Sequence, residues 1–348
     1  NMIINQKEYK SVWWEHNRLY AIDQNKLPWE LSIVEFTDYL QVAQAIKDMT
    51  VRGAPAIGTA AAFAMALAAQ VAPEDRFRVS LREARKHLIE TRPTAVDLLN
   101  GVNYVYEQTI KFIPDIKHCR QVAILAAQEF ARHSEEDCRT IGEIGSAIIQ
   151  DQSRILTHCN AGALATVDWG TALAAIRFAH RQGKKIFVYV SETRPRFQGA
   201  LLTAFELEQE GIPHSIIPDS ACGFYFWKKE IDLVITGADR VCLNGDVANK
   251  IGTYEKAVMA RYHRVPFYVA APLSTFDLGC IHGKDIPIEF RSEDEVKQFA
   301  GIPTANPSSP ALNPAFDITP AKLITGIITP QGIFPAFEAA QKVQKYYE

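Results

Sequence analysis

Lys185-Ile186-Phe187-Val188-Tyr189-Val190 is a run in which five apolar residues follow a single lysine without any apolar–polar alternation. Such a run is typical of a strand that is buried on both faces, as in a parallel sheet covered by helices. Similar short runs, separated by helical stretches, recur in the second part of the chain at Arg154–His158, Ser215–Ile217, Asp232–Thr236, Pro266–Ala271 and Leu323–Ile328. Strands that alternate with helices in this way predict a Rossmann-like α/β domain with a parallel sheet.

The first part of the chain has a different period. From Asp38 to about Phe130, apolar residues recur at steps of three and four, which predicts helices. Two short strand patterns precede this region, at Ser11–Trp14 and Arg18–Ile22, and a further helix is predicted at about Glu135–Ile149. We therefore expect a smaller, mainly helical N-terminal domain that opens with short β-strands.

Length and charge limit the class of protein. At 348 residues the chain has room for two domains, which we place at residues 1–130 and 131–348. Its 47% hydrophobic and 22% charged residues are an ordinary balance for a globular protein. With a net charge of −3 and no basic run longer than two residues, nothing points to a nucleic-acid partner.

The cysteines give no sign of a metal site. They stand at positions 119, 138, 159, 222, 242 and 280, without a C-x-x-C pair or a cysteine–histidine cluster of zinc-ligand spacing. No G-x-G-x-x-G follows a predicted strand, so a dinucleotide is not implied. We expect a reduced, cytoplasmic chain without metal or cofactor. Gly53–Pro73 is 21 residues without a charge, but it is rich in alanine, and we expect a buried helix rather than a membrane span.

A phosphate site is suggested by Arg52-Gly53-Ala54-Pro55-Ala56-Ile57-Gly58, which precedes an alanine-rich helical stretch. A helix that starts here directs its unpaired N–H groups and positive dipole end at the turn, where Arg52 adds a guanidinium. The alternative is an arginine on a loop beside a buried helix.

Two residues at predicted strand ends could act in catalysis. In an open parallel sheet, ligands bind beyond the carboxyl ends of the strands. Cys159 follows the first strand just before a glycine-containing turn into a helix, a place that favours a thiolate, although a lone cysteine is usually a small buried hydrophobe. Asp239 closes an apolar strand, where poor solvation raises a carboxyl pKa; the alternative is a helix N-cap or turn aspartate.

Amide and basic side chains follow the same strands. Asn249 and Lys250 come after an Asn-Gly-Asp turn and can offer an amide and an ammonium to sugar hydroxyls or a phosphate, but Asn-Gly alone is only a turn signal. Gln198 could equally be a surface amide. Thr91-Arg92-Pro93-Thr94 adds a second arginine on a predicted helix-start turn, where it shares a phosphate with Arg52 or is merely solvated.

In their order along the chain, nine segments closely resemble one family, the methylthioribose-1-phosphate isomerases. This family is part of the wider group that includes the regulatory subunits of translation initiation factor 2B. The segments are Leu27–Glu30, Val51–Gly58, Thr91–Val96, Thr157–Thr166, Glu192–Ala200, Ile235–Val241, Asn244–Tyr254, Ala270–Asp277 and Asn313–Pro320.

The resemblance implies an aldose–ketose isomerase of methionine salvage that forms a homodimer and needs no metal. It implies that Cys159 and Asp239 are the catalytic pair. It also implies that seven residues hold the phosphate and sugar, namely Arg52, Gly53, Ala54, Arg92, Gln198, Asn249 and Lys250.

Some positions depart from the family pattern. Asp97 stands where Asn is often found, Leu201 where Arg is usual, and Ala221-Cys222 replaces a Met-Ala type pair. These departures leave open an isomerase for 5-deoxyribose 1-phosphate or ribose 1,5-bisphosphate. A non-catalytic subunit that binds sugar phosphates or nucleotides is a further alternative.

Overall fold

A seven-stranded sheet forms the centre of the second half of the protein. The computed structural model describes residues 1–92 and 95–344, so Pro93 and Thr94 of the predicted turn at 91–94 lie outside the described residues. The strand order is β18 (Gly332–Phe334), β17 (Gly326–Thr329), β12 (Phe267–Ala270), β9 (Leu233–Thr236), β6 (Arg154–His158), β7 (Phe187–Ser191) and β8 (His214–Ile217). All neighbours are parallel except β17 and β18. The predicted Rossmann-like α/β fold is confirmed, and all six apolar runs contribute strands.

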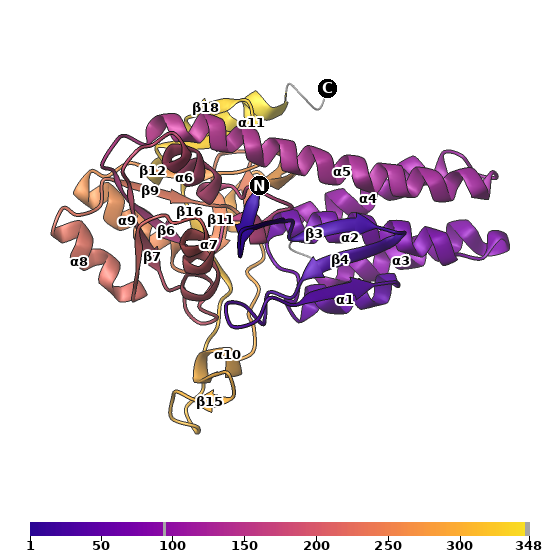
Figure 1. Ribbon diagram of the computed structural model, residues 1–348, viewed down its shortest axis with the longest axis horizontal. Helices are drawn as coiled ribbons and strands as arrows, with labels where there is room; N and C mark the ends of the chain where they lie inside the picture. Colours follow the sequence, from indigo (N-terminus) through magenta and orange to yellow (C-terminus); the bar gives the residue numbers. More distant parts are fainter. Residues whose placement is uncertain (93–94, 345–348) are drawn as a thin grey trace.

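Helices cover both faces of this sheet (Figure 1). Successive residues of β6 show why its sequence lacks polar alternation, since Ile155 belongs to one buried cluster and Leu156 to another. One cluster contains residues of α6 (Ala172–Arg181) and the other contains residues of α11 (Ala336–Gln344). A strand sandwiched in this way must be apolar on both sides.

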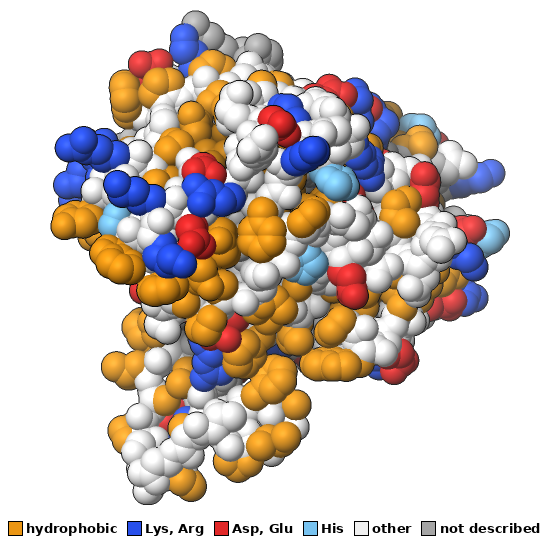
Figure 2. Space-filling model, turned by 60° about the vertical axis from the view of Figure 1, so that its left-hand side comes forward, with side chains coloured by type: hydrophobic (Ala, Val, Ile, Leu, Met, Phe, Trp, Pro, Cys, Tyr) orange, Lys and Arg blue, Asp and Glu red, His pale blue; other side chains and the backbone are white. Residues whose placement is uncertain are grey.

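Two further helices, α8 (Cys222–Trp227) and α9 (Thr253–His263), pack against each other at the outer side of the sheet. Their outward side chains include Trp227, which is 70% exposed, and Tyr262, which is 80% exposed. Figure 2 turns this side of the molecule forward and shows hydrophobic groups there among lysines and arginines.

A second, four-stranded sheet was not predicted. Its order is β13 (Phe276–Asp277), β10 (Arg240–Cys242), β11 (Val247–Lys250) and β16 (Phe316–Thr319). Strands β10 and β11 form an antiparallel hairpin whose turn contains the predicted Asn244-Gly245-Asp246, with Gly245 at φ 85°. This hairpin places Asn249 and Lys250 close to the residues at the carboxyl ends of β6 and β9 in the main sheet.

The first half of the protein is a small β-structure followed by helices. Strands β3 (Val12–Glu15), β4 (Arg18–Ile22) and β5 (Ile33–Phe36) form one sheet, and β1 (Met2–Ile4) pairs with β2 (Lys7–Tyr9). The helices are α1 (Tyr39–Lys47), α2 (Ala54–Val71), α3 (Phe77–Thr91), α4 (Val96–Ile110) and α5 (Ile116–Gly145).

Helix α2 lies in the middle of this helical half. It is long and apolar enough to cross a membrane by length and composition, but 89% of it is buried inside the protein, as in a core helix. Small side chains allow close packing: a Cβ added at Gly101 of α4 would lie 2.3 Å from the carbonyl oxygen of Gly58 in α2. The alanine run therefore serves packing between helices.

Helix α5 differs from the helix and the domain boundary expected in this region. The helix predicted at 135–149 is the second half of a single 30-residue helix, and the predicted domain boundary at 130/131 falls inside it. The helix packs against α2 and α4 in its first part and against α6 and β17 further along. The apolar face of the helix continues where its packing partners change. The sequence therefore has no helix-ending residues near Phe130. Figure 1 shows α5 running along both halves.

An arm projects from the second half at the bottom of Figure 1. It consists of α10 (Asp294–Lys297), β14 (Gln298–Phe299) and β15 (Ile302–Pro303). The loop predicted at Pro303–Pro314 follows, and most of it is exposed.

Candidate active site

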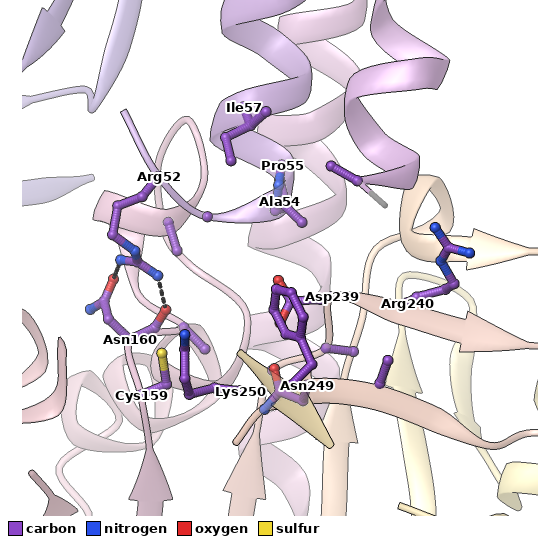
Figure 3. Close-up of a pocket in the computed structure, with 18 of the residues that line it drawn as sticks. Arg52, Ala54, Pro55, Ile57, Cys159, Asn160, Asp239, Arg240, Asn249 and Lys250 are labelled. Atoms are coloured by element: carbon purple, nitrogen blue, oxygen red, sulfur yellow. Dashed lines mark hydrogen bonds between the residues drawn. The ribbon is translucent and has the colours of Figure 1, made fainter. Parts of the chain in front are cut away.

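One cavity lies between the start of α2, the carboxyl ends of β6 and β9, and the β10–β11 hairpin (Figure 3). All nine residues singled out from the sequence line it, namely Arg52, Gly53, Ala54, Arg92, Cys159, Gln198, Asp239, Asn249 and Lys250. Five different parts of the fold therefore meet at a single place. Its position beyond the strand ends is where parallel sheets bind ligands.

The turn before α2 forms one wall of the cavity. Gly53 has φ 92°, and a Cβ there would lie 2.4 Å from the backbone of Ala165, so glycine is required for both conformation and space. Ala54 is the first residue of α2, and Pro55 stands in the first turn, where its missing N–H costs nothing. The helix thus begins at the cavity, as expected from the sequence, with Arg52 beside it.

Cys159 lies directly after β6 and is buried. It adopts φ 60°, and its backbone N–H donates to Thr193 Oγ1 at 2.8 Å. Burial raises the pKa of the Cys159 thiol, while the nearby charges of Arg52 and Lys250 lower it. Burial thus opposes the expected thiolate in the free protein. The turn after Cys159 leads into the short 3₁₀ helix Ala163–Ala165 rather than directly into the expected α-helix.

Asp239 lies three residues beyond β9 and is partly exposed as a residue, although its carboxyl group is desolvated. Its N–H donates to the carbonyl oxygen of Ala248 at 2.9 Å, which ties it to β11. Burial raises the pKa of its carboxyl group, while Lys250, Arg92 and Arg52 lower it. The expected direction of this pKa shift is confirmed. Asp239 precedes strand β10 and not a helix, so the alternative role as a helix N-cap is wrong.

Lys250 and Asn249 end strand β11 and are both buried. Burial lowers the pKa of the Lys250 ammonium, and the neighbouring Cys159 and Asp239 raise it. The Lys250 Nζ atom also lies 5.4 Å from the centre of the Phe316 ring. The Asn249 side chain donates to Thr253 Oγ1 at 3.0 Å. Lys250 therefore brings a cation close to both candidate catalytic residues.

Gln198 and Arg92 complete the polar lining. Gln198 is buried, and its Oε1 atom has no hydrogen-bond partner among the described residues, so the reading as a surface amide is wrong. An unpartnered buried acceptor facing a cavity is suited to a ligand hydroxyl. Arg92 follows α3, and its Nε atom lies 3.5 Å from Glu289 Oε2. With its side chain 12% exposed, it is not the solvated arginine of the alternative reading.

Asn160 was not singled out from the sequence as a site residue. Figure 3 shows its side chain bonded to Arg52 at the edge of the cavity. Its place beside Cys159 at a strand end could have pointed to Asn160. Asparagine is also common in turns, however, so this place alone does not indicate a site residue.

A second cavity adjoins the first. The two share Met49, Arg52 and Gln198. The second is walled by apolar side chains that come from distant segments, namely Trp29, Leu201, Leu202 and Phe299. The further arginine in its wall, Arg196, pairs with Glu295 at 3.1 Å. A substituent that extends from the first cavity would therefore meet a mostly apolar space.

No metal centre is apparent in the described residues, 1–92 and 95–344. Within them, no group of three or more His, Cys, Asp or Glu side chains is arranged to hold an ion. The absence of a metal remains a prediction.

Comparisons with known proteins show the family of the chain. The model of the initiation factor 2 subunit family matches residues 50–336. A methylthioribose-1-phosphate isomerase from Roseiflexus castenholzii is 49% identical over 341 residues, which cover 95% of this chain and 96% of that one. The crystal structure of 5-methylthioribose 1-phosphate isomerase from Pyrococcus horikoshii matches with a TM-score of 0.89 at 40% identity, covering 98% of this chain and 97% of that one.

A crystal structure described as translation initiation factor eIF-2B, subunit delta, from A. fulgidus is also similar. It matches with a TM-score of 0.84 at 41% identity, covering 97% of this chain and all of that one. With a family model over most of its length and relatives nearly half identical along its whole extent, the chain belongs to the initiation factor 2 subunit family and, within it, to the methylthioribose-1-phosphate isomerases.

Proposed function

We propose that this protein converts 5-methylthio-α-D-ribose 1-phosphate to 5-methylthio-D-ribulose 1-phosphate in methionine salvage. The observation that carries the proposal is that Cys159 and Asp239 line one cavity together with the cations Arg52, Arg92 and Lys250. A thiol and a carboxyl group whose pKa values are both raised by desolvation, in a basic pocket, suit an isomerase for a sugar phosphate.

The substrate phosphate binds to Arg52, Arg92 and the N–H groups at the start of α2, including that of Ala54. Guanidinium groups and a helix N-terminus both favour a phosphate dianion. Gly53 allows the close approach of this turn. Gln198 and Asn249 offer amides to the sugar hydroxyls, and Lys250 lies between the phosphate and the reacting carbons.

We assign the opening of the sugar ring to Asp239. Phosphate on C1 locks the sugar as a closed ring, so the ring oxygen must receive a proton before the C1–O bond can break. Burial raises the pKa of the Asp239 carboxyl group, which favours the protonated form that can supply that proton.

Cys159 acts at the next step, in which the hydrogen on C2 moves to C1. Either it leaves C2 as a proton, which Cys159 accepts and returns to C1, or it passes directly from C2 to C1 as a hydride. In the first case the thiol must give up its proton when substrate binds, since burial raises its pKa in the free protein. Both routes need water to be kept out, which the buried cavity provides.

The second cavity supports a methylthio group at C5. Its walls include the apolar side chains of Trp29, Leu201, Leu202 and Phe299, and Arg196 is already paired with Glu295, so no free cation other than the shared Arg52 faces this space among the described residues. A 5-phosphate would lose its hydration there without gaining a partner. This favours the methylthio sugar over ribose 1,5-bisphosphate.

The test is an assay of the purified protein against methylthioribose 1-phosphate, 5-deoxyribose 1-phosphate and ribose 1,5-bisphosphate, with ketose formation followed by NMR. Turnover that is fastest with the first sugar supports the proposal, and turnover fastest with either of the others would reassign the substrate.

A non-catalytic role is the second candidate, because of the A. fulgidus structure described as an initiation factor subunit. A binding subunit has no need of a buried thiol and a buried carboxyl in the same cavity. Absence of turnover with all three sugars, together with measurable binding, would favour this second role.

We also propose that the protein is a cytoplasmic homodimer. All six cysteines are free thiols, which fits a reducing compartment. The exposed side chains of α8 and α9, among them Trp227 and Tyr262, offer an apolar surface to a second copy (Figure 2). Light scattering should give twice the chain mass, and Trp227→Glu should shift it toward the monomer.

A further inference from the structure

We propose that Asn160 is a positioning residue that aims Arg52 into the cavity while leaving its positive charge uncompensated. It does so because Glu206 and Arg177, outside the cavity, hold the amide in place. This inference rests on the proposed function, since it concerns how the substrate phosphate is held.

Arg52 is fixed by Asn160 through two different atoms. Its NH1 group donates to the side-chain oxygen Oδ1 at 2.7 Å, and its NH2 group donates to the backbone carbonyl oxygen at 2.9 Å. Figure 3 shows both bonds and the guanidinium above Cys159 and Lys250. Two hydrogen bonds to one residue fix the plane of a guanidinium as well as its position.

Both acceptors are uncharged. Within residues 1–92 and 95–344, no carboxylate lies within ion-pair distance of Arg52, although its side chain is buried. Many buried arginines are paired with an acid, and such a pair would cancel the charge that a phosphate needs. An amide acceptor orients the guanidinium without this cancellation.

The other end of the Asn160 amide is anchored. Its Nδ2 group donates to Glu206 Oε1 at 2.9 Å and to Thr203 Oγ1 at 3.3 Å. An asparagine with Nδ2 on an acid and Oδ1 on an arginine is satisfied in only one orientation of its amide. Glu206 thus sets which atom faces Arg52.

Glu206 also holds the loop that follows Asn160. The N–H groups of Ala163 and Leu164 donate to its carboxylate at 2.8 and 3.2 Å. Gly162 allows this approach, because a Cβ there would lie 2.3 Å from the Glu206 carboxylate oxygens. The carboxylate therefore fixes the whole turn after Cys159.

The charge of Glu206 is balanced on the side away from the cavity. Arg177 of α6 is fully buried and bonds to both Glu206 and Glu210. The order from the core to the cavity is therefore Arg177, Glu206, Asn160, Arg52. Arg181 also lies 3.5 Å from Glu210, so two arginines balance the two glutamates, and the neutral amide separates this balanced group from an uncompensated cation.

The test replaces the amide by the carboxylate of the same shape. Asn160→Asp places a negative charge against Arg52 and Glu206, with Arg177 behind them. It should weaken the binding of inorganic phosphate, measured by calorimetry at pH 7.5, at least thirtyfold. Asn160→Ala, which loses orientation but adds no charge, should weaken it three- to tenfold. With substrate, KM should rise by similar factors, and by more than kcat falls.

A matched control comes from the remote pair Arg85 and Asn103, in which Arg85 Nε donates to the asparagine Oδ1 at 2.8 Å. Asn103→Asp makes the same chemical change away from the cavity and should leave phosphate binding and KM unchanged.

The outcomes separate the two proposals. If the wild type isomerises the sugar but both Asn160 variants bind phosphate like wild type, the positioning role is wrong and the function stands. If no sugar is isomerised but phosphate binding depends on Asn160 as described, the function is wrong and the positioning role stands. Should Asn160→Asp fail to fold, Asn160→Ala with unchanged phosphate affinity would by itself overturn the inference.

Discussion

The carboxyl group of Asp97 is fully buried at the start of α4 and accepts a hydrogen bond from Thr275 Oγ1 at 3.3 Å, while its Oδ1 atom has no partner among the described residues. Burial raises the pKa of Asp97 to about 6, with hydrogen bonds from Ser274 and Thr275 opposing the shift. A carboxyl in such a place is most stable when protonated. Asp97 is one of the positions at which the chain departs from the family pattern.

The pKa of Asp97 predicts how stability depends on pH. The folded pKa of about 6 exceeds the model value of 3.8, so the folded protein binds the proton more tightly and loses stability as pH rises from 3.8 through 6. Two pKa units correspond to about 3 kcal/mol. Asp97→Asn should therefore raise the free energy of unfolding by about 1–3 kcal/mol at pH 8 and by much less near pH 4. Denaturant titrations at both values provide the check; an equal effect at each would contradict it.

The catalytic assignment predicts separate losses for two conservative variants. Cys159→Ser and Asp239→Asn keep size and hydrogen bonding but remove the group that holds or transfers a proton. Each should lower kcat by about a hundredfold or more, with substrate still bound and thermal stability little changed. Steady-state kinetics and a melting curve suffice. A variant that kept more than about a tenth of wild-type kcat would remove its residue from the chemistry.

Arg52→Ala should weaken phosphate and substrate binding together. A charge-assisted hydrogen bond contributes about 1.5–3 kcal/mol, which corresponds to roughly 10- to 150-fold in affinity. Arg85→Ala provides the matched control, since Arg85 also bonds to an asparagine but lies outside the cavity lining. Inorganic phosphate as a competitive inhibitor gives the measurement, and equal inhibition of Arg52→Ala and wild type would rule the assignment out.

Treatment with a chelator should leave activity unchanged. Four basic residues of the described chain line the cavity, namely Arg52, Arg92, Arg240 and Lys250, and the described residues hold no cluster of three potential metal ligands. Turnover after dialysis against EDTA is the measurement. Loss of turnover that a divalent cation restored would require a different mechanism.

The apolar second cavity predicts an order of substrates. A methylthio group buries more apolar surface than a methyl group, at about 0.8 kcal/mol for each CH₂-sized unit, so the preference over 5-deoxyribose 1-phosphate should be about 1–2 kcal/mol. That corresponds to a ratio of about ten in kcat/KM. Ribose 1-phosphate should rank third, because its 5-hydroxyl loses hydration against Leu201 and Phe299. If kcat/KM were highest for 5-deoxyribose 1-phosphate, the C5 assignment would fail.

Local patterns in the sequence predicted the main sheet but not the second one. Strand β7 is apolar on both faces, and this appears directly in the five consecutive apolar residues Ile186–Val190. Strand β11, by contrast, ends in the polar Asn249 and Lys250, and its partner β16 lies more than sixty residues further along the chain. Strands that pair across such a distance in the chain show no local sequence period from which the sheet could be predicted.

Burial explains what could and could not be predicted at the site. The raised pKa of Asp239 followed from its place after an apolar strand, and the structure agrees. The sequence did not reveal that burial opposes the ionisation of Cys159, because the segments that cover its thiol meet only in the folded chain. The role of Asn160 depends on Arg177 and Glu206, which approach it only in the folded chain.

Helix α5 constrains how a ligand can reach the cavity. At 30 residues it is about 45 Å long, and it is packed into the cores of both halves. A clamshell motion between the halves would have to bend or break this rod, with the loss of its hydrogen bonds and of packing at one end. We therefore expect the sugar to enter through the second cavity, where Trp29 and the arm at Phe299 form the rim, and the scaffold to stay rigid during turnover.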